Sequence, residues 1–352
     1  MSAAFKPIAL TMGDVAGIGP EIIAKSFLEA ADQTAGCVVV GNVLAMQRAI
    51  QVVHDAYPSE PQLTLLPLTQ LQDLPREVPA LTVPVLQVSP DGSAAALPAW
   101  GRVSGLAGQW AADAVTWSAH AALRGDVSAI VTAPLHKEAL SAAGVPFPGH
   151  TELLQACAAM HARVAVADMP VRMMLANDEL RTVLVSIHVS LRAAIEAVTV
   201  ENILQTLRIT HQAQLRATGQ VPHMGVAGLN PHAGEGGLLG REELDIIIPA
   251  LQQARAEGMW VSGPFAPDTV FMRARSTPDQ RGEFDVVIAM YHDQGLIPVK
   301  YLGVDEGVNV TLGLPLVRTS PDHGTAFDLA GTGKASPASF LAALALARKL
   351  AG

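Results

Sequence analysis

Three histidines follow apolar runs that are typical of buried strands: 182–187 precedes His188, 226–231 precedes His232, and 286–291 precedes His292. In open α/β sheets, ligands bind beyond the carboxyl ends of the strands. Neutral imidazole is a common ligand of zinc and related ions, and three protein ligands with an open position are typical of a catalytic metal. The pattern predicts one divalent metal on these histidines, with Asp293 supporting its neighbour His292. The alternative is three strand-end histidines that are simply hydrogen-bonded.

A second set of residues predicts an anion site. The sequence Gly149-His150-Thr151-Glu152 opens a helix, where free backbone N–H groups favour a phosphate or carboxylate. Lys300, Asn309 and Arg318 follow at intervals of nine, and both cations lie beside apolar stretches, where a charge needs a partner. The spacing therefore predicts that His150, Thr151, Lys300, Asn309 and Arg318 form one phosphate pocket, although solvated surface charges remain the alternative.

The glycine-rich segments exclude two familiar nucleotide sites. Residues 13–20 lack the Gly-Lys-Ser/Thr of a Walker loop, and no strict GxGxxG of the Rossmann type occurs. Segment 322–331 contains His323, Gly324, Thr325 and Asp328. It resembles the loop with which isopropylmalate and isocitrate dehydrogenases hold the adenosine end of NAD(P). An ordinary glycine-rich turn before the last helix is the alternative.

The elements that must position these residues alternate along the chain. Strands are predicted at 7–12, 37–40, 128–132, 171–176, 182–187, 223–229 and 286–290. Helices are predicted from about 20, after Asn42, and at 104–124, 151–162, 200–217, 241–256 and 337–350. Such alternation favours an α/β fold with mostly parallel sheets and helices on both faces. The stretch 59–100 holds seven prolines and is expected to be rich in loops, with two short edge strands.

Composition narrows the class of protein. The 352 residues are 50% hydrophobic and 16% charged, which excludes a disordered chain. A net charge of −9 without basic runs argues against nucleic-acid and anionic-membrane partners. Two cysteines exclude a disulfide framework and a cysteine-based zinc site. The N-terminus lacks signal-peptide features and no run is long enough to span a membrane, so we expect a cytoplasmic protein.

With these motifs in view, the chain resembles the 4-hydroxythreonine-4-phosphate dehydrogenase family of pyridoxal phosphate biosynthesis. The matching stretches are GDVAGIGPE at 13–21, TAPLHK at 132–137, GHTE at 149–152, NPHAGEG at 230–236, Gly-Pro at 263–264 with Asp-Thr at 268–269, YHDQG at 291–295, and VNVTLGLP at 308–315, continuing to 331. They run through nearly the whole sequence. One departure is Val15, which stands where many members have proline.

The resemblance implies a fold like that of the isopropylmalate and isocitrate dehydrogenases, with two lobes and a cleft between them. Residues 1–140 and 300–352 would form the nucleotide-side lobe, and 141–299 the lobe for metal, substrate and dimerisation. It implies a homodimer with the active site at the subunit interface. It also places the metal (Zn, Mg or Co) on the three histidines, the phosphorylated substrate on the five anion-site residues, and NAD or NADP on segment 322–331.

The implied reaction is oxidation of a secondary alcohol, followed by loss of CO₂ from the β-keto acid. Asp268 and Lys137 are the candidates for the proton-accepting group. The expected substrate is 4-phosphohydroxy-L-threonine. The alternatives are threonate or erythronate 4-phosphate and an aromatic cis-dihydrodiol, which has no phosphate for Lys300, Asn309 and Arg318 to bind. A binding protein without turnover and a phosphoacyl or phosphoryl transferase are the competing classes.

Overall fold

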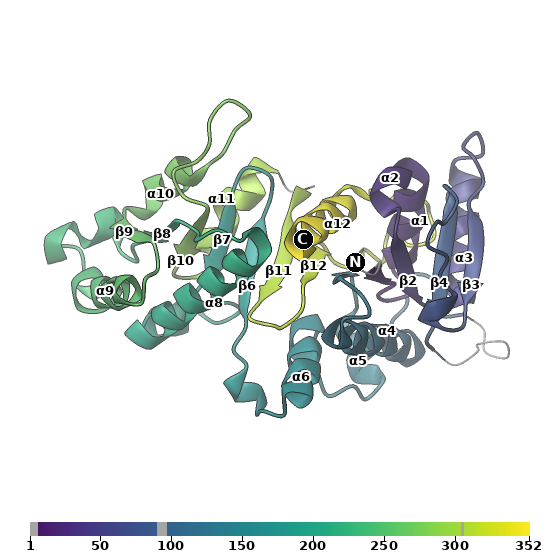
Figure 1. Ribbon diagram of the computed structural model, residues 1–352, viewed down its shortest axis with the longest axis horizontal. Coiled ribbons are helices and arrows are strands. Elements are labelled where there is room, and N and C mark those ends of the chain that lie inside the picture. Colours follow the sequence, from purple (N-terminus) through teal and green to yellow (C-terminus); the bar gives the residue numbers. More distant parts are fainter. Residues whose placement is uncertain (1–5, 90–96, 304–305) are drawn as a thin grey trace, which may run out of the picture. The chain divides into compact units, whose positions relative to one another are not determined.

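The computed structural model describes residues 6–89, 97–303 and 306–352, and the chain divides into two compact units (Figure 1). The first unit comprises Met1–Met169 with Leu314–Ala351, and the second comprises Pro170–Gly313 with Gly352. The boundaries differ from those expected. Residues 141–169 belong to the first unit because helix α6 (His150–Ala162) packs on α4 (Gly105–Arg124). Residues 300–313 belong to the second because β11 (Val308–Leu312) pairs with β6 (Arg172–Ala176).

The described residues of the first unit form six parallel strands. Their order is β3 (Thr64–Leu68), β4 (Thr82–Gln87), β2 (Cys37–Gly41), β1 (Ile8–Thr11), β5 (Ala129–Thr132) and β12 (Arg318–Pro321). Its remaining helices are α1 (Gly19–Glu29), α2 (Ala31–Thr34), α3 (Val43–Ala56), α5 (Lys137–Ala142) and α12 (Ala338–Ala351). Strands β1, β2 and β5 are buried along their whole length, which explains why they are continuous aliphatic runs in the sequence.

The helix boundaries of this unit follow the capping residues in the sequence. The Asn42 side chain accepts a hydrogen bond from the Ala45 N–H at 3.0 Å and begins α3, as predicted. Ser104 caps α4, and Gly125 ends it with a left-handed φ of 77°. In the proline-rich stretch, β3 is the edge strand and β4 its neighbour, so the two expected strands are confirmed. Residues 90–96 of that stretch lie outside the described residues, as do residues 1–5 of the N-terminal segment.

In the second unit, the described residues form a mixed set of six strands. Their order is β11, β6, β7 (Arg181–Leu184), β10 (Val286–Ala289), β8 (Met224–Ala227) and β9 (Val261–Phe265). The β11–β6 and β6–β7 pairs are antiparallel, and the others are parallel. Its helices are α7 (Leu191–Glu196), α8 (Val200–Thr218), α9 (Ile248–Ala256), α10 (Pro267–Ala274) and α11 (His292–Leu302). The helix predicted at 241–256 begins with a π-helical segment, Glu243–Ile247.

The core of the second unit lies around β7 and β10. Leu184, Val287 and Ala289 pack there with Leu296 of α11 and Val270 of α10, all of them buried. This packing fixes the two helices that begin just after β10 and β9, at the edge where the candidate histidines lie. In neither unit does a described helix combine the length and the apolar composition that crossing a membrane requires.

Candidate functional site

The three predicted metal ligands follow three neighbouring parallel strands. His188 comes after β7, His292 after β10 and His232 after β8, and these strands are adjacent in the order β7, β10, β8. Neighbouring strands lie ~4.8 Å apart, so their carboxyl ends can bring side chains into contact. The rings of His188 and His292 do meet, with centroids 5.6 Å apart. Asp293 Oδ1 lies 2.7 Å from His292 Nδ1, as outer support for a ligand would require.

His232 lies on a loop of unusual backbone conformation. Residues 232–236 all have positive φ angles, between 45° and 80°, and the His232 side chain is exposed. Within the described part of the chain, no three His, Cys, Asp or Glu side chains come close enough together to hold a metal ion. One chain therefore brings together two of the three histidines. The pair fits two ligands of a metal, and the three-ligand site stays a prediction.

A buried carboxylate holds the His232 loop in place. Glu243 is only 2% exposed, and its Oε1 accepts hydrogen bonds from the N–H groups of Leu229 and Asn230, each at 2.7 Å. Its Oε2 accepts from Asn230 Nδ2 at 2.9 Å. Gly234 passes so close that a Cβ would lie 2.6 Å from Glu243 Oε2, which explains why a glycine occupies this position. The loop is therefore held by its backbone while His232 faces outward.

A second side chain ties the ends of β10 and β8 together. Gln294, in the first turn of α11, accepts from the Met290 N–H at 2.6 Å and donates to the Gly228 carbonyl at 2.8 Å.

Asp268 lies in the first turn of α10, which follows β9, the neighbour of β8. It is exposed and has no hydrogen-bonding partner among the described residues. Four adjacent strands thus lead to His188, His292, His232 and Asp268 at one edge of the second unit.

Part of the predicted anion site is assembled in the first unit. Arg318, at the start of β12, is 4% exposed, and its Nε and Nη2 donate to Thr132 Oγ1 at 3.1 and 2.7 Å. Burial lowers the Arg318 pKa to about 10, so the guanidinium stays charged at neutral pH. Burial, and then the charge of Arg318, lower the pKa of His150 well below its usual value. A neutral imidazole and a charged guanidinium therefore lie near the start of α6, with Thr151 next to His150.

The other two predicted phosphate contacts belong to the second unit. Lys300 lies in the last turn of α11 and Asn309 within β11, and both are half-buried. The apolar stretch before Lys300 belongs to α11, where Val299 is buried and Ile297 is 63% exposed. A single pocket formed by all five residues stays a prediction.

The predicted nucleotide loop packs on the turn after β1. The Ile18 N–H donates to the Thr325 carbonyl at 3.0 Å, and a Cβ on Gly17 would lie 2.9 Å from Thr325 Cβ. Other residues of the loop are open to solvent: His323, Gly324 and Asp328 are exposed, and a Cβ on Gly324 would meet no atom within 4 Å. Glu21 of α1 accepts hydrogen bonds from the N–H groups of Gly331 and Gly333, which fixes the end of the loop. A loop anchored on one side and open on the other fits the dinucleotide that the sequence predicts.

Two side chains in the first unit were not singled out from the sequence. Asp14 is fully buried, and burial raises its pKa; its Oδ1 accepts from the Ala16 N–H at 2.8 Å, while its Oδ2 has no partner in the described structure. His136 also has an unpartnered buried atom, Nδ1, and its ring stacks on Phe327 of the nucleotide loop with centroids 4.7 Å apart. Asp14 and His136 follow the neighbouring parallel strands β1 and β5. Their strand-end positions are the signal that could have identified them. Lys137, directly after His136, is exposed at the start of α5.

Known proteins resemble this chain along nearly its whole length. Residues 33–347 match the family described as pyridoxal phosphate biosynthetic protein PdxA. A protein of Beijerinckia indica named 4-hydroxythreonine-4-phosphate dehydrogenase is 50% identical over 346 residues, which cover 98% of this chain and 95% of the relative. A Salmonella typhimurium protein named D-threonate 4-phosphate dehydrogenase is 43% identical. The matched region covers 98% of this chain and 99% of the relative.

A solved structure extends the likeness to the fold. The crystal structure of 4-hydroxythreonine-4-phosphate dehydrogenase from Klebsiella pneumoniae is 40% identical and has a TM-score of 0.85. The matched region covers 99% of this chain and 100% of the Klebsiella chain. Matching sequence and matching fold along nearly the entire chain leave one conclusion: it belongs to the PdxA family of pyridoxal phosphate biosynthetic proteins.

Proposed function

We propose that this chain oxidises 4-phosphohydroxy-L-threonine with NAD(P) in pyridoxal phosphate biosynthesis, a cytoplasmic reaction. The observation that carries the proposal is the row of His188, His292 and His232 at the ends of three adjacent parallel strands. The identity with proteins named as dehydrogenases for this substrate supports it.

The proposed reaction breaks the C–H and O–H bonds of one secondary alcohol. The hydride passes to the nicotinamide, which becomes NAD(P)H, and the hydroxyl proton passes to a base on the protein. The product is a β-keto acid, which loses CO₂ to give 3-amino-2-oxopropyl phosphate. Asp268 is the proposed base, since it is exposed at the same strand edge as the histidines, and Lys137 is the alternative.

The adjacent imidazoles of His188 and His292 would hold a divalent zinc, magnesium or cobalt ion, with His232 as a further ligand. When bound, such an ion stabilises negative charge on a substrate oxygen. Because one chain does not bring His232 to the other two, we propose that a second copy of the chain supplies it. The active site would then lie at the interface of a homodimer.

Exposed apolar side chains on the segments that carry the three histidines support the proposed dimer. Leu191 follows His188 and is 60% exposed, and Leu238 follows His232 and is 83% exposed. Tyr301, on the helix that His292 begins, is 89% exposed. Large apolar side chains that gather around functional loops are typical of surfaces that another protein covers.

The remaining contacts are assigned by charge. Arg318, with Thr132 beneath it and His150 and Thr151 nearby, would bind the substrate phosphate, because a dianion in a crevice needs charge-assisted donors. Lys300 and Asn309 are proposed as further substrate contacts. His323, Gly324, Thr325 and Asp328 would bind the adenosine half of the dinucleotide.

A substrate panel tests the proposal. NADH or NADPH formation is followed by absorbance with 4-phosphohydroxy-L-threonine, D-threonate 4-phosphate, D-erythronate 4-phosphate and an aromatic cis-dihydrodiol, each with Mg²⁺, Co²⁺ or Zn²⁺. We expect the highest kcat/KM for the first substrate. A higher value for D-threonate 4-phosphate, the substrate in the name of the Salmonella relative, would move the function to that acid. Absence of reduced dinucleotide with every substrate would contradict a dehydrogenase.

A further inference from the structure

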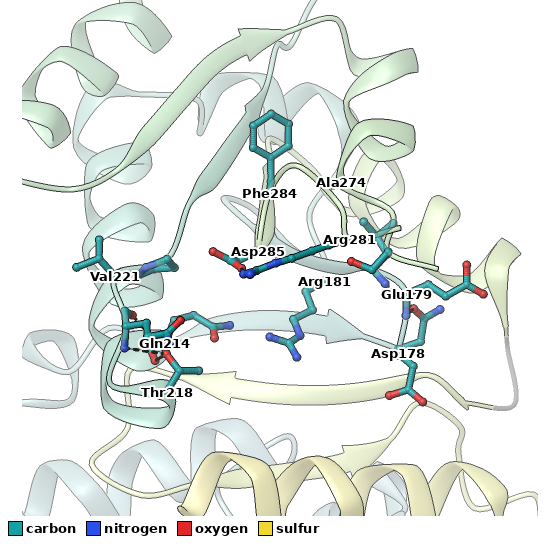
Figure 2. A pocket seen from close by; sticks show the side chains of 15 residues that line it. Asp178, Glu179, Arg181, Gln214, Thr218, Val221, Ala274, Arg281, Phe284 and Asp285 are labelled. Carbon is teal, nitrogen blue, oxygen red and sulfur yellow. Dashed lines mark hydrogen bonds and ion pairs between the residues drawn. The ribbon is translucent and has the colours of Figure 1, made fainter. Parts of the chain in front are cut away.

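A cavity of about 290 Å³ lies in the second unit, at the opposite end of the strands from the histidines (Figure 2). Arg181 begins β7 and Asp285 directly precedes β10, so the cavity is at the amino ends of these strands. The histidines follow the carboxyl ends of the same strands. The cavity is therefore separate from the candidate active site, although both are built on one set of strands.

Arg181 lines this cavity, and its charged side chain has no partner among the described residues. Figure 2 shows its side chain between Gln214 and Thr218 on one side and Asp178 and Glu179 on the other. Arg181 is half-buried, yet its side chain forms no hydrogen bond or ion pair with any other residue in the described ranges. A guanidinium carries five N–H donors, and partial burial without a partner is costly.

The second arginine of the cavity is already paired. Arg281 forms an ion pair with Asp285 at 2.8 Å, and Asp285 also accepts the His223 N–H at 2.8 Å. Glu179 forms an ion pair with Arg275. These pairs leave Arg181 as the cation that a ligand oxygen would meet.

Gln214 provides a second polar group in the same cavity. It is 3% exposed, and its amide Nε2 donates only to the sulfur of Met174, at 3.7 Å. Sulfur is a weak acceptor, so this buried amide is poorly satisfied by the protein itself. Because Gln214 lines the cavity, its amide can bond to a ligand there.

The charges around Arg181 define the class of ligand. Asp178, Glu179 and Asp285 line the cavity, as does the carboxyl end of α8 at Thr218, where the helix dipole favours positive charge. A dianion would be repelled by these groups, whereas a simple cation would leave Arg181 unpaired. A molecule with one carboxylate and one ammonium group satisfies both sides.

We propose that this cavity binds a small α-amino acid, with its carboxylate on Arg181 and its ammonium group toward the acidic side. The volume admits this class. At ~30 Å³ per water molecule, 290 Å³ holds about ten waters, so an amino acid with a short side chain fits with room for bridging waters. This site does not depend on the function proposed above.

Isothermal titration calorimetry on the full chain tests the proposal, with L-serine, acetate, methylamine and inorganic phosphate as ligands. We expect L-serine to bind at least about tenfold more tightly than acetate or methylamine, because only a zwitterion uses both sides of the cavity. Arg181→Gln should weaken L-serine binding by about tenfold to a hundredfold, and Arg181→Lys by less. Arg216→Gln, an exposed arginine of α8 outside the cavity, should bind as the unmodified chain does.

The variant His188→Ala separates this site from the active site. It should bind L-serine normally even where it abolishes turnover. Circular dichroism establishes that each variant is folded before titration, and Arg181→Lys keeps the test valid if Arg181→Gln does not fold. Equal binding by Arg181→Lys, Arg181→Gln and the unmodified chain would overturn the proposal. So would phosphate or acetate binding as tightly as L-serine, or no L-serine binding at all.

Discussion

Asp14 is a carboxylic acid that the fold buries completely, with one oxygen unpartnered among the described residues. Burial raises its pKa above the ordinary value of 3.8 and outweighs the hydrogen bond from Ala16 and the nearby His136. The folded state therefore binds this proton more tightly than the unfolded state does. Its contribution to stability is complete below pH 3.8 and is lost as the pH rises through the folded pKa.

The direction of this pKa shift gives a prediction for Asp14→Asn. Asparagine keeps an oxygen for the Ala16 N–H and removes the titration, so the variant should gain stability relative to the unmodified chain between about pH 4 and pH 8. Urea unfolding at several pH values measures the difference. A difference that stays constant over this range would contradict the burial argument.

A second prediction for a single residue concerns Arg318. Arg318→Ala should lower kcat/KM for a phosphorylated substrate by about 30-fold to several thousand-fold, because a buried charged oxygen would lose its partner at ~2–5 kcal/mol. Arg318→Lys should recover only part, since an ammonium group cannot make the bidentate contact. Steady-state kinetics with a phosphorylated and an unphosphorylated substrate separate the effects. Equal losses for both would make Arg318 a structural residue and not a phosphate ligand.

Among the elements, the loop that carries His232 depends on one buried side chain. Glu243→Ala would leave the N–H groups of Leu229 and Asn230 without their acceptor, at a cost of ~1–3 kcal/mol for each group that stays unsatisfied. We expect a lower melting temperature, weaker metal binding and lower kcat/KM. Asp245→Ala is the matched control, because it removes only an exposed ion pair with Arg241, which water screens strongly. The prediction fails if the two variants behave alike.

Elements with strong local signals were predictable from the sequence. The caps Asn42 and Ser104 and the aliphatic runs of β1, β2 and β5 mark boundaries that the structure confirms. Helix α11 was not predicted, because Gly295 and Pro298 are ordinarily unfavourable inside a helix. Gly295 is needed there: a Cβ would lie 2.4 Å from the side chain of Leu184. Tertiary packing, which the sequence does not display, overrides propensity at this helix.

In the candidate site, too, the sequence indicates some features and does not indicate others. The sequence predicts that the three histidines share one edge, since each follows an apolar run, and the strand order is consistent with this. The sequence does not indicate that Thr132 binds Arg318, because their pairing joins strands 186 positions apart. Nor could periodicity predict the left-handed backbone at His188 and His232.

For the whole molecule, the proposed shared site can be tested by mixing inactive chains. His188→Ala and His232→Ala should each be nearly inactive alone. If His188 and His292 of one copy act with His232 of another, a mixed dimer has one site lacking both histidines and one site with all of them intact. Co-expression from differently tagged copies should therefore restore up to about half the activity per mixed dimer, measured by NADH formation after double-affinity purification.

The control for this experiment is the pair His188→Ala and His292→Ala. These histidines meet within one chain, so in the mixed dimer every site keeps one defect and activity should not return. Sedimentation of the purified mixture establishes that mixed dimers are present. If the first pair gave no recovery although the mixed dimer had formed, His232 would have to act within its own chain.

The first unit is assembled from both ends of the chain, and this has a consequence for biosynthesis. Residues 170–313 leave the ribosome as a complete unit, while the preceding unit still lacks β12 and α12. Helix α12 packs against β5 and β12 and buries Phe340 and Leu344 fully. Until α12 has been made, the earlier-made part of the first unit therefore exposes an apolar sheet surface, while the later-made insertion can already be folded. A released fragment that ends at residue 337 should be cut by protease within residues 1–169 and resist cleavage within 170–313.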